Sequence, residues 1–123
     1  MFGQLDRDRR AILNALDQSQ ARIEFALDGT ILTANENFLK TVGYTLAEIK
    51  GQHHRIFMPP EDAAGDAYRA FWAALNRGES HSAKYRRLAK GGREIWIQAS
   101  YNPVLSRTGR PYKVVKFATD VTE

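Results

Sequence analysis

Two consecutive histidines, His53 and His54, are the side chains of this sequence best suited to hold a cofactor. A neutral imidazole is a good axial ligand for haem iron, and His54 would be the metal ligand if haem binds. Adjacent side chains diverge, and His54 lies nearer the apolar Ile56 and Phe57, so we expect His54 to face the interior. The alternative is that both histidines are turn residues that hydrogen-bond to the backbone.

A second group of residues has the chemistry to surround a ligand. Arg87 lies on a predicted strand, where it either binds a carboxylate or an anionic ring or lies exposed to solvent. Phe71 and Trp72 belong to an aromatic stripe at helical spacing, which describes an ordinary core and also suits stacking on a planar ring. The other candidate pocket residues lie on two later strands: Ile97, Ala99, Tyr101 and Ala118.

The composition favours one domain without catalytic machinery. The 123 residues are 43% hydrophobic and 26% charged, which is ordinary for a globular protein. With no cysteine there is no thiolate nucleophile or thiolate metal site. Neither a nucleophile elbow nor a phosphate-binding glycine loop is present, so we expect no enzyme. No apolar run is long enough to span a bilayer, and we expect a cytoplasmic protein without direct membrane insertion.

The net charge of +4 does not predict a nucleic-acid partner, because the basic residues are scattered among acids. Lys84, Arg86 and Arg87 form the densest basic group. They lie on one predicted strand and therefore divide between its two faces. This pattern favours a solvated sheet face, with anion binding as the alternative.

The first half of the chain must position these residues through a hairpin and several helices. Ile23, Phe25 and Leu27 have strand periodicity, and Asp28-Gly29 predicts a type I′ turn into a strand over 30–34. Short helices are expected from Asn35 to Val42, stopped by Gly43, and from Thr45 onward, stopped by Gly51, the second with a capping box formed with Glu48. A longer helix is predicted over 62–76.

The second half of the chain predicts three strands, over 81–88, 93–105 and 112–119. Both long strands are apolar on both faces, which indicates that the outer face is covered. The cover available is an amphipathic helix over 5–20, whose apolar stripe comprises Leu5, Ile12, Leu13 and Leu16. We expect Trp96 to contact Ile12, Leu13 and Leu16. The alternative is that this stripe pairs two copies of the chain.

These features together resemble a PAS domain, most closely the PAS modules of bacterial methyl-accepting chemotaxis receptors. The resemblance rests on Asp28-Gly29, Ala34-Asn35, Gly43-Tyr44-Thr45 with Glu48-Ile49 and Gly51, Pro60-Glu61-Asp62, Lys90-Gly91-Gly92, Asn102-Pro103-Val104, Gly109-Arg110-Pro111 and Asp120-Val121-Thr122-Glu123. It implies an α+β PAS fold: a five-stranded antiparallel sheet with short helices on one face and an N-terminal amphipathic cap helix. Residues 1–20 would be the cap helix and residues 21–123 the PAS core.

The resemblance also implies a sensor in signal transduction and chemotaxis. Such a module senses a ligand or cofactor and relays its state, as a homodimer formed through the N-terminal helix, to a C-terminal signalling domain. The alternative is a ligand-free PAS interaction and dimerisation module. Haem and FAD are the candidate cofactors, beside an empty or self-filled pocket. Arg87 stands where flavin-binding members place an amide side chain, a departure that argues against FAD.

Overall fold

The computed structural model describes residues 2–123, so position 1 of the expected cap helix lies outside it. None of the helices in this range combines the length and apolar character that crossing a bilayer needs. The helices and strands, in chain order, are α1 (Phe2–Ser19), β1 (Ala21–Phe25), β2 (Ile31–Ala34), α2 (Glu36–Val42), α3 (Leu46–Ile49), η1 (His54–Phe57), α4 (Pro60–Ala63), α5 (Asp66–Asn76), β3 (His81–Leu88), η2 (Lys90–Gly92), β4 (Glu94–Leu105) and β5 (Pro111–Asp120).

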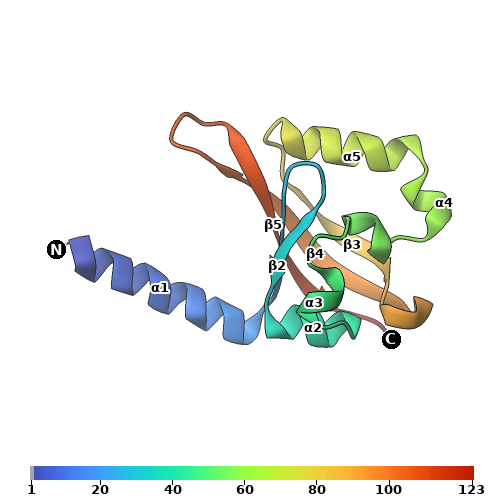
Figure 1. The fold of residues 1–123 in the computed structure, drawn as a ribbon, viewed down its shortest axis with the longest axis horizontal. Coiled ribbons are helices and arrows are strands. Elements are labelled where there is room, and N and C mark those ends of the chain that lie inside the picture. The colour runs from blue at the N-terminus through green and yellow to red at the C-terminus, as the bar shows by residue number, and fades with distance from the viewer. Residues whose placement is uncertain (1) are drawn as a thin grey trace.

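The five strands form one antiparallel sheet in the order β2-β1-β5-β4-β3. The first and last strands of the chain are therefore neighbours, although about ninety residues separate them, with Ala21 opposite Ala118. The helices from α2 to α5 gather on one side of this sheet, as Figure 1 shows. The predicted α+β fold is confirmed.

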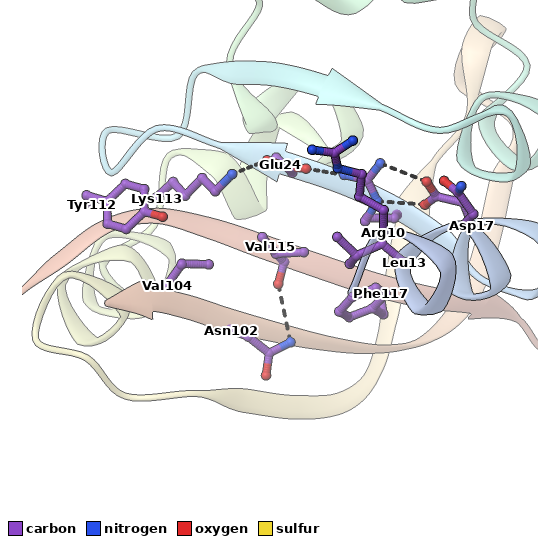
Figure 2. Close-up of a pocket in the computed structure, with 12 residues that line it drawn as sticks. Arg10, Leu13, Asp17, Glu24, Asn102, Val104, Tyr112, Lys113, Val115 and Phe117 are labelled. Atoms are coloured by element: carbon purple, nitrogen blue, oxygen red, sulfur yellow. Dashed lines mark hydrogen bonds and ion pairs between the residues drawn. The ribbon is translucent and has the colours of Figure 1, made fainter. Parts of the chain in front are cut away.

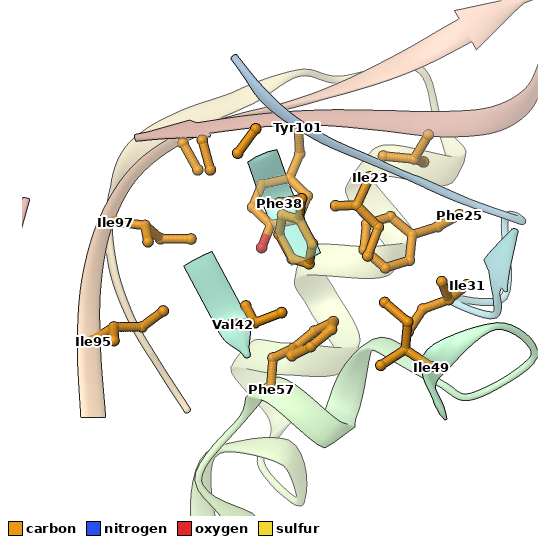
Figure 3. Close-up of a cluster of buried hydrophobic side chains, with 14 of the residues drawn as sticks. Ile23, Phe25, Ile31, Phe38, Val42, Ile49, Phe57, Ile95, Ile97 and Tyr101 are labelled. Carbon is orange, nitrogen blue, oxygen red and sulfur yellow. The ribbon is translucent and has the colours of Figure 1, made fainter. Parts of the chain in front are cut away.

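The core lies between the inner face of the sheet and these helices. On β4, alternate residues from Ile95 to Tyr101 are buried, as the period of a strand requires. Figure 3 shows side chains from the strands and from the α2 and α3 region pointing toward one another. The largest apolar side chains of the core that are fully buried are Ile23, Phe25, Ile31, Phe38, Ile49, Phe57, Leu75, Ile95, Ile97 and Tyr101.

The caps of the two short helices agree with the sequence, except that α3 ends at Ile49 with Lys50 as its C-cap, before the expected Gly51. The Asn35 side-chain oxygen accepts from the backbone N–H of Phe38 at 3.0 Å and begins α2, and Gly43 ends it with φ of 77°. Thr45 and Glu48 form the predicted capping box of α3. The Asn35 amide nitrogen also donates to the carbonyl of Gln20 at 2.7 Å and to the Asp17 carboxylate at 3.1 Å. One side chain thus holds α2 and the end of α1 together.

Two local predictions are wrong. The turn after β1 is not type I′, because within residues 2–123 only glycines have positive φ; Gly29 has φ of 92° and Asp28 does not share it. The Asp28 side chain instead accepts from the N–H of Thr30 at 2.9 Å. The single helix expected over 62–76 is divided into α4 and α5, because Gly65 adopts extended backbone angles between them.

The third correction concerns the cover expected over the outer face of the sheet. α1 runs away from the core (Figure 1), and its apolar stripe is left exposed, with Ile12 at 55% and Leu13 at 56%. Trp96 is 40% exposed as well. The expected packing of Trp96 on Ile12, Leu13 and Leu16, which would bury all four side chains within one chain, is therefore wrong. A helix docked through its end alone leaves its stripe for a surface outside its own fold.

Candidate functional site

His54 lies at the centre of the interior, fully buried, at the start of η1. Its Nδ1 is 2.6 Å from the hydroxyl of Tyr68 on α5, and its Nε2 is 2.9 Å from the hydroxyl of Tyr101 on β4. The Phe25 and Trp72 rings meet the imidazole edge to face, with centroids 5.2 and 5.5 Å away. His54 is therefore the inward histidine, as expected, and both of its nitrogens have hydrogen-bond partners.

Arg87 extends the hydrogen bonds of His54 toward β3. Its Nη2 donates to the Tyr101 hydroxyl at 3.2 Å, and its Nη1 donates to the carbonyl of Arg86 at 2.9 Å. Because Tyr101 accepts from Arg87, its own proton is free to go to Nε2 of His54, which places the imidazole proton on Nδ1. Arg87 is only 7% exposed, so the expectation of a solvent-exposed strand residue is wrong, while binding of a carboxylate or an anionic ring stays a prediction.

Lys116 completes the group and was missed by the sequence analysis. It lies on β5 directly opposite Tyr101 and is 1% exposed. Its ammonium is 4.9 Å from the centre of the Tyr101 ring and 5.6 Å from that of Phe38. We call Tyr68, His54, Tyr101, Arg87 and Lys116 the interior polar cluster. A signal existed in the sequence, since Lys116 alternates with the inward Val114 and Ala118.

Burial and positive charge set the protonation of this cluster. Burial lowers the pKa of His54 well below its ordinary value, and the charges of Lys116 and Arg87 lower it further. Burial also lowers the pKa of Lys116, an effect that Arg87 reinforces. Burial raises the pKa of Tyr68 to about 12. The histidine is therefore neutral and the tyrosines keep their protons, which is the state that the hydrogen bonds require.

His53 has a structural position at the edge of the interior. Its Nδ1 accepts from the N–H of Arg55 at 3.0 Å and caps η1, and its Nε2 donates to the carbonyl of Asp28 at 2.7 Å. This ring packs against Gly29, where an added Cβ would lie 2.5 Å from Nε2. His53 thus joins the β1–β2 turn to η1, and it does not point with His54 into the cluster.

The other candidate pocket residues also lie in the interior. Trp72, Ile97, Ala99 and Ala118 are all buried in the core. Ile97 and Ala118 line a cavity of about 10 Å³ together with Arg87 and Lys116. Trp72 packs on His53 and His54 and does not line this cavity. The sequence thus predicted correctly that these residues face the interior. Their contact with a ligand stays a prediction.

The residues around His54 do not fit haem or FAD in this arrangement. Sites for ligands of that size enclose roughly 300 Å³ or more, whereas the interior cavity has about 10 Å³. Both nitrogens of His54 are already within hydrogen-bond distance of tyrosine hydroxyls, so neither is directed at a metal. Within residues 2–123, no cluster of three or more histidine or acidic side chains is arranged to hold a metal ion.

A groove of about 660 Å³ lies on the other side of the sheet, between α1 and the outer face of β1, β4 and β5 (Figure 2). Leu13 of α1 and Val115 and Phe117 of β5 line it. At its edge Lys113 donates to Glu24 at 2.6 Å. The groove is the space left between the projecting helix and the sheet, and the interior polar cluster does not reach it.

The order of the strands in the sheet and the helices gathered on one of its faces define the class of fold. The PAS fold model matches residues 31–118, and the chain belongs to the PAS family. A solved PAS domain from Colwellia psychrerythraea superimposes with a TM-score of 0.78 over 92% of this chain and 96% of its own, at 22% identity, which supports the fold alone.

Two curated relatives specify the resemblance further. The biofilm dispersion protein BdlA of Pseudomonas aeruginosa is 46% identical over 118 residues, which is 96% of this chain and 28% of BdlA. The aerotaxis receptor of Escherichia coli is 31% identical over 97 residues, 79% of this chain and 19% of the receptor. The chain therefore spans less than a third of either relative, and the similarity concerns a PAS module within each. The predicted likeness to chemotaxis-type PAS modules is confirmed.

Proposed function

We propose that this PAS sensory domain detects a change at its interior polar cluster and relays it to a C-terminal output domain, as a cytoplasmic homodimer without catalytic activity of its own. The observation that carries the proposal is the position of the cluster. Tyr68 and His54 belong to α5 and η1, while Arg87, Tyr101 and Lys116 belong to three adjacent strands. A ligand that moved one of these groups would shift helices and sheet together.

The route toward an output domain would run along β5 to the end of the chain. Lys116 lies four residues before Asp120, whose carboxylate accepts from the N–H of Thr122 at 2.8 Å. The Thr122 hydroxyl accepts from the N–H of Trp96 on β4 at 2.9 Å. The last residues are thus attached to the strand that carries Tyr101. A movement between β4 and β5 would change the direction in which the chain continues.

The exposed stripe of α1 supports the dimer. Leu5, Ile12, Leu13 and Leu16 are between 38% and 56% exposed, and together they form an apolar face on an otherwise charged helix. An exposed apolar stripe of this kind on a projecting helix is suited to pairing with its own copy. The same face suits the alternative function, a ligand-free interaction module. The small interior cavity favours that alternative as well.

A fusion to a reporter output tests the sensory function. The chain is placed before a histidine-kinase output domain, and output is compared between the native sequence and Tyr101→Phe, which breaks the cluster at its centre. Tyr112→Phe is the matched control, because Tyr112 is 55% exposed on the neighbouring strand. We expect Tyr101→Phe to change the output and Tyr112→Phe to leave it unchanged. Output that is equal in all three fusions would contradict the proposal and favour the interaction module.

A further inference from the structure

The interior of the domain carries positive charge without a negative partner. Arg87 and Lys116 are buried, and neither takes part in an ion pair anywhere in residues 2–123. The buried polar residues of this range are His54, Arg87 and Lys116, with no carboxylate among them. A guanidinium stays charged in any protein environment, and burying a charge without a partner is strongly unfavourable.

The two cations also share one space. Both line the cavity of about 10 Å³, whose remaining walls include Phe38, Ile97 and Ala118. The Nε of Arg87 is buried and has no hydrogen-bond partner within the described chain, although its two terminal nitrogens do. A cavity of this volume holds about one water-sized species. The residue that carries this unpaired donor therefore lines a space that suits one small species.

We propose that this cavity binds a small monoanion, of the size of chloride or formate, between Arg87 and Lys116. The anion supplies the missing negative charge and accepts hydrogen bonds from the guanidinium and the ammonium. This proposal rests on the proposed sensory function, because it specifies the class of ligand that the interior detects. Larger anions are excluded by Phe38 and by the other apolar walls.

Arg87 provides a route from solvent to this cavity. Its side chain lines a surface groove of about 390 Å³ as well, beside Tyr68, Phe71 and Tyr85. The acids at the rim of this groove are already paired: Asp62 lies 3.5 Å and Glu61 3.9 Å from Arg86. Arg87 thus lines both the groove and the cavity, and we expect a small ion to enter past its side chain.

Thermal unfolding of the whole 123-residue chain under anion exchange tests the proposal. Sodium chloride or sodium formate replaces sodium gluconate at constant ionic strength, since gluconate is too large for the cavity. We expect Tm to rise with the logarithm of chloride or formate concentration, as it does for a ligand that binds only the folded state. A larger effect of chloride identifies a halide site, and a larger effect of formate identifies a carboxylate site.

Paired substitutions locate the effect. Arg87→Gln and Lys116→Met should each weaken the apparent affinity at least tenfold. The control Lys84→Met removes an exposed charge of the same strand, away from the cavity and the groove, and should keep the native response. If Arg87→Gln does not fold, Lys116→Met decides, since replacing a buried, unpaired amino group by an apolar side chain should raise Tm in gluconate. Chloride and formate responses no larger than that of gluconate, or undiminished in Lys116→Met, would overturn the proposal.

The anion titration and the kinase fusion can fail independently, so the two proposals can be told apart. A flat anion titration together with a kinase fusion that responds to Tyr101→Phe would reject the anion and retain the sensor. A clear titration together with an unresponsive fusion would retain the anion site and reject the relay.

Discussion

Lys116 and Tyr101 face each other on β5 and β4, with the ammonium 4.9 Å from the centre of the aromatic ring. The Tyr101 hydroxyl, at the far end of that ring, accepts from Arg87 and bonds to His54. One residue pair therefore links a buried cation, a second buried cation and a neutral histidine. The hydrogen bonds and charges of the interior meet at Tyr101.

Tyr101→Phe removes the hydroxyl without changing the packing of the ring. It leaves a donor of Arg87 and the Nε2 of His54 without their partner in the interior. We expect the free energy of unfolding to fall by about 2 kcal/mol, the usual cost of leaving a buried polar group unsatisfied. Urea unfolding measures this value. Tyr112→Phe on the exposed side of the sheet should stay within about 0.5 kcal/mol of the native chain, and an equal loss in both variants would disprove the role of the hydroxyl.

The lowered pKa values of the two histidines lead us to expect that the free energy of unfolding falls in mild acid. Burial lowers the pKa of both His53 and His54 in the folded state below the unfolded value of 6.5. As pH falls through 6.5, the unfolded chain binds protons that the folded chain does not, so the free energy of unfolding decreases until the folded pKa is reached. Urea titrations between pH 8 and pH 5 should show this decrease. In His54→Phe the slope should be smaller, and an unchanged slope would show that His54 does not cause it.

Gly29→Ala is predicted to be far more damaging than the same change at another glycine with positive φ. Gly29 and Gly91 have φ of 92° and 81°, and each substitution costs about 1–2 kcal/mol for the left-handed backbone alone. At Gly29 the added Cβ also meets Nε2 of His53 at 2.5 Å, whereas at Gly91 nothing lies within 4 Å. Thermal unfolding should therefore show a clearly larger loss for Gly29→Ala. Equal losses would mean that His53 moves aside freely.

The alternation of residues predicted much of the fold. Strand periodicity identified the inward face of β4, and glycine and threonine signals identified the short helices, because both follow from local geometry. Lys116 was missed because a lysine is ordinarily expected to be exposed, although its alternation with Val114 and Ala118 places it on the inner face. The hydrogen bond between Tyr68 and His54 likewise depends on the packing of α5 against η1. An amphipathic stripe such as that of α1 reveals an apolar face without revealing what covers it.

Introducing a charge into the apolar stripe of α1 tests whether the chain dimerises through this helix. Leu13→Asp should shift the chain toward monomer, because an unpaired carboxylate would be buried at the helix interface. Leu105→Asp is the control, since Leu105 is similarly exposed, at 53%, but lies on β4. Sedimentation velocity over a range of concentrations measures the populations. A native chain that stays monomeric throughout, or an equal effect of Leu105→Asp, would reject dimerisation through α1.

The side chain of Asn35 makes the start of α2 depend on the end of α1. Its amide nitrogen donates to Gln20 and Asp17 while its oxygen accepts from the N–H groups of Arg22 and Phe38. Deleting the residues up to and including Gln20 would remove both acceptors and weaken the start of α2, whose Phe38 lies in the core. The loss of association in a truncated chain would then combine a missing interface with a damaged core. The role of α1 in association therefore cannot be measured by deleting the helix, and single substitutions on its exposed stripe are needed instead.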